Sequence, residues 1–168
     1  MSRTQGFINE LDHELGLTRQ LVALLPAARS DWRPHPKSMK LGILALHLTD
    51  TLKWGVDTLT TVELDFSPIG APPWQPTPFI SVAATLEALD RNGAALNAAL
   101  AACPDEALFV PWSLKQGGKT LFTLPRIAVL RSMIFNHHIH HRGQLTVYLR
   151  LLDVALPGTY GPSADAGA

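Results

Sequence analysis

The chain has 168 residues, and its 14 basic and 14 acidic side chains give a formal net charge of zero. This length suits one domain, which we expect to cover residues 1–168, with residues 157–168 as a C-terminal tail. The balanced charge and the lack of a basic run leave nucleic-acid binding without electrostatic support, and the single cysteine, Cys103, excludes an internal disulfide bond.

No apolar run reaches the roughly 18–20 residues that a membrane span requires. The polar start, from Met1 to Gln5, does not resemble a secretory signal. We therefore expect no membrane partner and a cytoplasmic location.

Two long amphipathic helices are expected in the first part of the chain. Apolar residues recur at helical spacing from Phe7 to Leu25, which predicts the first helix. The connection over residues 30–37 contains two prolines, which forbid helix continuation. Ser38 is a suitable N-cap for a second helix that runs to about Glu63.

A proline-rich crossover and a third helix follow. The stretch from Asp65 to Pro78 contains four prolines before its last residue, too many for a helix or a central strand. We expect it to cross the bundle as a long linker, with Trp74 packed onto the helices. Residues from Phe79 to Cys103 have helical spacing and predict the third helix.

A short β-prone segment separates the third helix from the fourth. Two runs rich in apolar and β-branched residues flank Gly117-Gly118, which is typical of a hairpin. The fourth helix is expected to open near Thr123, with Pro125 in its first turn, where proline is tolerated. It continues to Leu152, and Gly143 in its interior suggests a close contact with another helix.

Together these elements predict an all-α fold. We expect a four-helix bundle with a long crossover after the second helix and a small hairpin or ordered loop before the fourth.

The fourth helix contains a dense histidine run. Four of the seven histidines lie within the five positions 137–141: His137, His138, His140 and His141. Residues four apart stack on one face of a helix, so His137 and His141 point the same way and are spaced to bind one transition metal. The spacing alone leaves a buried, hydrogen-bonded cluster equally open, because two imidazoles on a buried stripe need partners of some kind.

A fifth histidine interrupts the apolar side of the second helix. His47 lies near the middle of that helix, between two leucines. A helix bundle allows inward residues from distant segments to converge, so His47 is a candidate third ligand. Asp50 and Thr51 follow three and four residues later and are placed to reach the same pocket.

These motifs together resemble the DinB/YfiT-like family. The resemblance rests on His47, on the run HHIHHRGQL over residues 137–145 and on the tail PGTYGP over residues 157–162, and it covers nearly the whole chain. It implies a four-helix bundle, often a homodimer. The family includes metal-dependent thiol-transferases that use small cytoplasmic thiols and a related thiol-dependent isomerase, and many members have no assigned reaction.

The resemblance also implies one divalent metal held by three histidines. Matched residue by residue, these are His47, His137 and His141, while His138 and His140 match positions that vary or are not ligands in the family's pattern. Three neutral imidazoles leave a coordination position open, as in catalytic rather than structural sites. All-histidine sites suit several transition metals, and we expect zinc or nickel, with iron or manganese as alternatives.

Residues around the ligands have open roles at this stage. Asp50 and Gln144 are candidate acceptors for the second N–H of a ligand histidine. Tyr148 either lines the pocket or packs in the core, and Arg142 either anchors an anion or is structural. No catalytic residue or general base can be assigned.

Three hypotheses about function follow. The first is a metal-dependent enzyme that performs thiol transfer or hydrolysis on a small-molecule substrate, with a low-molecular-weight thiol as a possible partner. The second is a non-catalytic metal-binding protein of a stress response. The third is a helical dimer with a metal-free histidine cluster.

Overall fold

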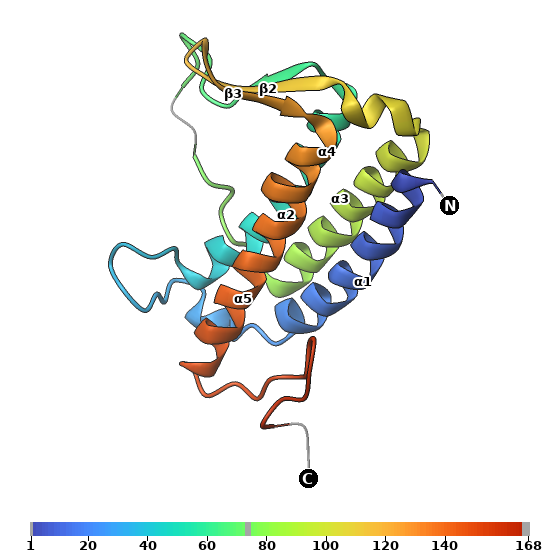
Figure 1. Ribbon diagram of the computed structural model, residues 1–168. Coiled ribbons are helices and arrows are strands. Elements are labelled where there is room, and N and C mark those ends of the chain that lie inside the picture. Colours follow the sequence, from blue (N-terminus) through green and yellow to red (C-terminus); the bar gives the residue numbers. More distant parts are fainter. Residues whose placement is uncertain (1, 73–74, 166–168) are drawn as a thin grey trace.

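The computed structural model describes residues 2–72 and 75–165 (Figure 1). Trp74, expected to pack onto the bundle, lies outside the described residues. The α-helices are α1 (Arg3–Ala23), α2 (Leu41–Thr60), α3 (Val82–Ala102), α4 (Arg126–Val129) and α5 (Asn136–Arg150). The strands are β1 (Glu63–Asp65), β2 (Pro111–Gln116) and β3 (Lys119–Pro125), and the 3-10 turns are η1 (Ala27–Arg29) and η2 (Asp105–Phe109). A π-helical turn, η3 (Leu130–Phe135), joins α4 to α5.

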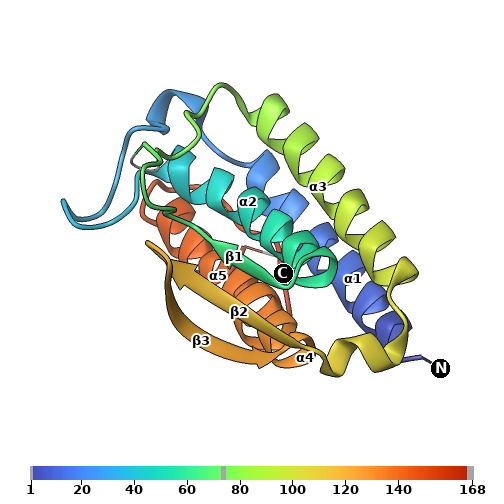
Figure 2. The ribbon, with the colours of Figure 1, turned by 90° about the horizontal axis from the view of Figure 1, so that it is seen from above.

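The helices form a bundle in which α3 packs against both α1 and α2, and α5 packs against α2 and α1 (Figures 1 and 2). Figure 1 shows α4, η3 and α5 as one continuous rod, so the expected fourth helix is a single rod built from three helical pieces. Among the described residues, no helix combines the length and the apolar character that crossing a membrane requires.

Two clusters of buried apolar side chains form the core. One contains Leu52, and the other contains Leu48, so the clusters meet near the middle of α2. His47 lies at this same level of the helix. Truncating a leucine in such a core costs about 2–5 kcal/mol, so the packing on both sides holds the backbone around His47 in place.

The prediction of an all-α fold is wrong, because three strands form a mixed sheet in the order β1-β2-β3. The expected hairpin is confirmed as the antiparallel pair β2 and β3, and Gly117 and Gly118 both adopt positive φ in its turn. The unexpected strand is β1, which pairs in parallel with β2. Asp65 fastens it, since its carboxylate accepts main-chain N–H groups from Gly117 and Gly118 at 3.1 and 2.7 Å.

The second helix begins later than expected. Ser38 lies in the loop, and α2 starts at Leu41 without a side-chain cap. The loop itself supplies the missing acceptors: the main-chain N–H groups of Leu41 and Gly42 donate to the carbonyls of Trp32 and Ser30 at 2.8 and 2.9 Å. Folding of the loop back onto the helix therefore replaces the capping side chain.

Two boundaries around the sheet also differ from the prediction. The third helix begins at Val82 rather than Phe79, because the Ser81 hydroxyl accepts from the Ala84 N–H and caps it. The fourth helix begins at Arg126, because β3 extends through Pro125. Pairing with β2 therefore takes the residues that helical spacing alone assigned to the first turn.

Gly143 does not mark a close helix contact, contrary to expectation. It is exposed on α5, and a Cβ atom placed there would meet no other atom within 4 Å. The close approaches in this bundle occur elsewhere, for example at Gly55, where a Cβ atom would lie 2.8 Å from the Leu96 side chain.

Candidate metal centre

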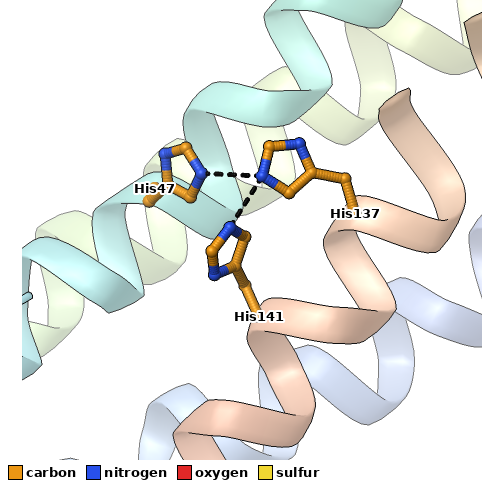
Figure 3. A group of neighbouring side chains, drawn as sticks. All are labelled: His47, His137 and His141. Atoms are coloured by element: carbon orange, nitrogen blue, oxygen red, sulfur yellow. Dashed lines mark hydrogen bonds between the residues drawn. The ribbon is translucent and has the colours of Figure 1, made fainter. Parts of the chain in front are cut away.

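Three histidines from two helices converge on one point (Figure 3). His47 projects from the second turn of α2, and His137 and His141 project from α5, one turn apart. The Nε2 atoms of His137 and His141 are 2.7 Å apart, and those of His47 and His137 are 3.2 Å apart. One nitrogen from each ring lies within 4.8 Å of the others. The three residues predicted as ligands are therefore neighbours, while metal binding itself stays a prediction.

The outer nitrogens of two rings are already bonded to oxygens that can only accept. His137 Nδ1 lies 3.2 Å from the carbonyl oxygen of Met133, and His141 Nδ1 lies 2.7 Å from the amide oxygen of Gln144. A carbonyl oxygen has no proton to donate, so each Nδ1 must carry one. In the neutral rings, the Nε2 atoms are therefore bare lone pairs.

Two contacts join the Nε2 atoms of the three rings, and only one of them has a proton available for a hydrogen bond. His47 is able to donate an N–H to His137 Nε2, which accounts for one of the two short contacts. The contact between His137 and His141 then joins two acceptors at 2.7 Å, which repel unless a cation lies between them. Either an additional proton or a metal ion supplies that charge, and the donor set suits a transition metal.

The surroundings oppose the proton. Burial, and to a smaller extent the neighbouring His141 and His137, together lower the pKa of His47 to about 4. Burial also lowers the pKa of His137 and that of His141, against the opposing effect of their bonds to Met133 and Gln144. Three rings that stay neutral at pH 7 present ligands in the protonation state that a metal needs.

The cluster is partly open to solvent and has an aromatic neighbour. His47 and His137 are half-buried, and His141 is 8% exposed. The indole of Trp54, two turns after His47 on α2, lies 5.7 Å from the His47 ring and 5.8 Å from the His137 ring, centroid to centroid. The exposed His140 ring lies 5.0 Å from that of His141.

Of Asp50 and Gln144, the two candidate acceptors for a histidine N–H, only Gln144 contacts the cluster. Gln144 contacts His141, as described above. Asp50 pairs instead with Lys53 at 2.7 Å and influences His47 only through its charge, which acts to raise the pKa of that ring. Thr51 faces away from the cluster, with its hydroxyl donating to the Leu48 carbonyl at 3.0 Å.

The open roles of Tyr148 and Arg142 are decided in favour of structure. Tyr148 packs edge-on against Trp32, with ring centroids 5.7 Å apart. The guanidinium of Arg142 is 2% exposed and forms an ion pair with Glu14 at 2.5 Å, and it also bonds to the Tyr160 hydroxyl. A cation that is already paired in this way is not available to anchor a substrate anion.

Sequence reasoning missed the partners that α1 supplies to α5. Glu14 and Thr18 are buried, and the Thr18 hydroxyl lies 2.8 Å from Nε2 of His138. A signal existed, because both residues continue the helical stripe that Leu11 and Leu21 mark on α1. A carboxylate on an apolar stripe indicates a buried cationic partner.

The fold is similar to that of two solved structures. A DinB-like protein from Bacillus cereus is 24% identical, with a TM-score of 0.69 over 93% of this chain and 97% of that chain. A DinB-like protein from Bacillus subtilis is 16% identical, with a TM-score of 0.68 over 90% of this chain and 95% of that chain. No curated protein matches the chain. The model of the DinB family matches residues 1–168, which confirms the resemblance, and the chain therefore belongs to the DinB family.

Proposed function

We propose that His47, His137 and His141 bind one divalent transition metal, zinc or nickel, and that the protein is a metal-dependent enzyme acting on a small molecule. The observation that carries the proposal is the convergence of their Nε2 atoms while Met133 and Gln144 occupy the outer nitrogens. A hydrogen-bonded cluster without metal would need either an extra proton, which burial of the rings disfavours, or a Gln144 amide turned so that its NH2 group faces His141.

The protein's own residues define what such a site does. A divalent metal held by three neutral imidazoles supplies Lewis acidity and retains a position for an exogenous ligand. His137 and His141 present their lone pairs because their other nitrogens donate elsewhere. The Trp54 ring lies beside the rings of His47 and His137, and these two histidines are only half-buried, so solvent reaches them in part.

The surroundings favour thiol transfer over hydrolysis. Hydrolysis benefits from a general base beside the attacking water. In the part of the chain that the structure describes, Asp50, whose charge acts on His47, pairs with Lys53, and we identify no free carboxylate bonded to the cluster. Transfer of a thiol to an electrophile would not need such a base, because a bound metal would favour the thiolate, with its proton released to solvent. The sulfur would then bond to the electrophilic atom as that atom's leaving group departs. We therefore propose thiol transfer first, with hydrolysis as the alternative.

Elemental analysis of untagged protein tests metal binding. We expect about one metal ion per chain in the wild type, as for a three-ligand site, and loss of that metal in His47→Ala and His141→Ala. His140→Ala is the matched control, because His140 is an exposed histidine on the same helix. It should retain the metal.

A metal-free wild type that also takes up no added zinc, nickel or manganese would sink the proposal and leave a histidine-lined core. If metal is present, the loaded protein is next screened with a panel of low-molecular-weight thiols and small electrophiles. Thiol-dependent turnover that disappears in His47→Ala supports the enzyme. A tightly bound metal with no exchangeable ligand and no turnover instead supports a non-catalytic metal-binding protein.

A further inference from the structure

We infer that Gln144 is a positioning residue for this site: its amide oxygen keeps the proton of His141 on Nδ1 and so reserves Nε2 for the metal. The inference rests on the proposed function, because it assumes that Nε2 is a ligand. It goes further because it states that one side chain, Gln144, determines which nitrogen of His141 carries the proton.

The geometry ties Gln144 to His141 specifically. The two residues lie three apart on α5, which places them on neighbouring positions of the helix surface. The amide oxygen is 2.7 Å from Nδ1, while Nε2 of the same ring lies 2.7 Å from Nε2 of His137. His141 is 8% exposed, so water has little access to replace this acceptor.

The other α5 ligand does not depend on a side chain. His137 Nδ1 donates to the main-chain carbonyl of Met133, an acceptor that no substitution removes. His141 has only the Gln144 amide in this role among the described residues. The two ligands are therefore held by acceptors of different kinds. A single substitution is able to remove the acceptor of His141 but not that of His137.

The amide group also has an orientation that works and one that does not. With the oxygen toward His141, Nδ1 donates and Nε2 is free to ligate. With the NH2 group toward His141, Nδ1 would have to accept, the proton would move to Nε2, and the ligand would be blocked. A carboxylate at position 144 lacks the second orientation, so it should hold the ligand at least as well as the amide.

The test compares Gln144→Leu, which removes the acceptor, with Gln144→Glu, which keeps it. Affinity is measured by competing zinc, and separately nickel, against a chromophoric chelator. Loss of such an acceptor weakens metal binding by about 10–100-fold, and we expect this for Gln144→Leu. Gln144→Glu should bind as tightly as the wild type or more tightly. Gln20→Leu is the matched control, because it makes the same change at an exposed position of α1.

A second readout separates positioning from general structural damage. In the zinc-loaded protein, the proton on His141 Nδ1 is observed by nitrogen-15 NMR and its exchange with water is timed. Exchange should be slow in the wild type and Gln144→Glu and faster in Gln144→Leu. Circular dichroism checks folding, and Gln144→Ala replaces the leucine variant if that variant does not fold.

Equal affinity and equal proton exchange in wild type and Gln144→Leu overturn this inference and leave the three-histidine site intact. Weakening in Gln144→Glu as large as in Gln144→Leu overturns it as well, because the retained acceptor did not rescue binding. A wild type that binds neither zinc nor nickel overturns the proposed function, and the inference with it.

Discussion

Helix α5 has two polar faces that differ in how their hydrogen bonds are satisfied. One face turns His138 and Arg142 toward α1, and the other turns His137 and His141 toward α2. The first pair is one turn apart, as is the second. The residues are similar in type and adjacent in sequence, so the difference between the faces comes from their partners.

On the α1 face, His138 and Arg142 have polar partners at hydrogen-bond distance, and Nδ1 of His138 also lies 3.4 Å from the Thr51 hydroxyl of α2. The Thr18 hydroxyl donates to the Glu14 carbonyl at 2.9 Å and therefore accepts from Nε2–H of His138 at 2.8 Å. Arg142 pairs with the Glu14 carboxylate, and the Tyr160 hydroxyl from the tail also donates to that carboxylate at 2.7 Å. Every charge here has an opposite charge or a donor beside it.

On the α2 face, acceptors meet acceptors. His137 and His141 direct bare lone pairs at each other, and their protons lie on the far nitrogens. A buried polar group with its partners in place is structural, whereas one that lacks a cation is poised to bind one. The contrast therefore supports the proposed ligands more sharply than the histidine spacing does.

The largest expected effect comes from breaking the α1 face. Glu14→Gln leaves the Arg142 charge buried without its partner, which should lower the free energy of unfolding by about 3–5 kcal/mol. Urea denaturation measures the change. Glu10→Gln is the control, since Glu10 pairs with Arg131 at a more exposed site, where such pairs contribute about 0–1 kcal/mol. Metal content per folded chain should not change, and a Glu14→Gln variant that keeps its stability but loses metal would contradict the division between the faces.

The next effect tests the α2 face. Zinc at 100 times its dissociation constant should stabilise the wild type by about 2.7 kcal/mol, because it binds the folded state. His137→Ala should abolish this stabilisation, measured as the zinc-dependent rise in Tm. His138→Ala should be less stable without zinc but should retain the rise. If both variants lose it equally, the two faces act as one unit.

Acid should destabilise the metal-free protein through both faces. Burial is the largest of the effects that lower the pKa of His47 to about 4 and that of His138 to about 3, from an ordinary value of 6.5, and neighbouring cationic side chains add to it. At a pH between the lowered pKa of the folded state and 6.5, the unfolded state binds more protons than the folded state. The free energy of unfolding therefore falls as the pH drops below about 6.5. Each fully buried histidine contributes at most about 1.4 kcal/mol per pH unit, and the more exposed His47 contributes less.

The histidines are told apart by substitution in the same pH series. His138→Gln should reduce the slope of unfolding free energy against pH more than His47→Gln does. His140→Gln is the control, because His140 is exposed. A slope that is unchanged in His138→Gln would show that this residue does not stay neutral in the folded protein.

The smallest effect concerns the outer surface of α5, which belongs to neither face. Gly143 is exposed and has open space around it, so Gly143→Ala should stabilise the protein by about 0.5–1 kcal/mol. Thermal denaturation measures the gain, and metal content should be the same as in the wild type. A loss of stability would instead support the prediction from the sequence that Gly143 lies at a close helix contact.

Much of this protein follows from local sequence. Helical spacing predicts four long helical segments, and Gly117-Gly118 predicts the hairpin turn, because residues three, four or two apart interact within one element. The same reason places His137 and His141 on one face of α5. Local spacing does not predict that His47 joins these two histidines. Packing of helices in a bundle makes the convergence possible, and the resemblance to the DinB family pointed to this histidine.

Tertiary structure alone decided the rest. The strand β1 exists because Glu63 to Asp65 pair with residues about fifty positions later, and its three residues have no pattern of their own. Likewise, nothing within α5 distinguishes His138 from His137. Their tautomers depend on Thr18 and Met133, one from a distant helix and one from the preceding turn. Which nitrogen is free to bind a metal is therefore set by acceptors brought together through packing, and no spacing in the sequence encodes it.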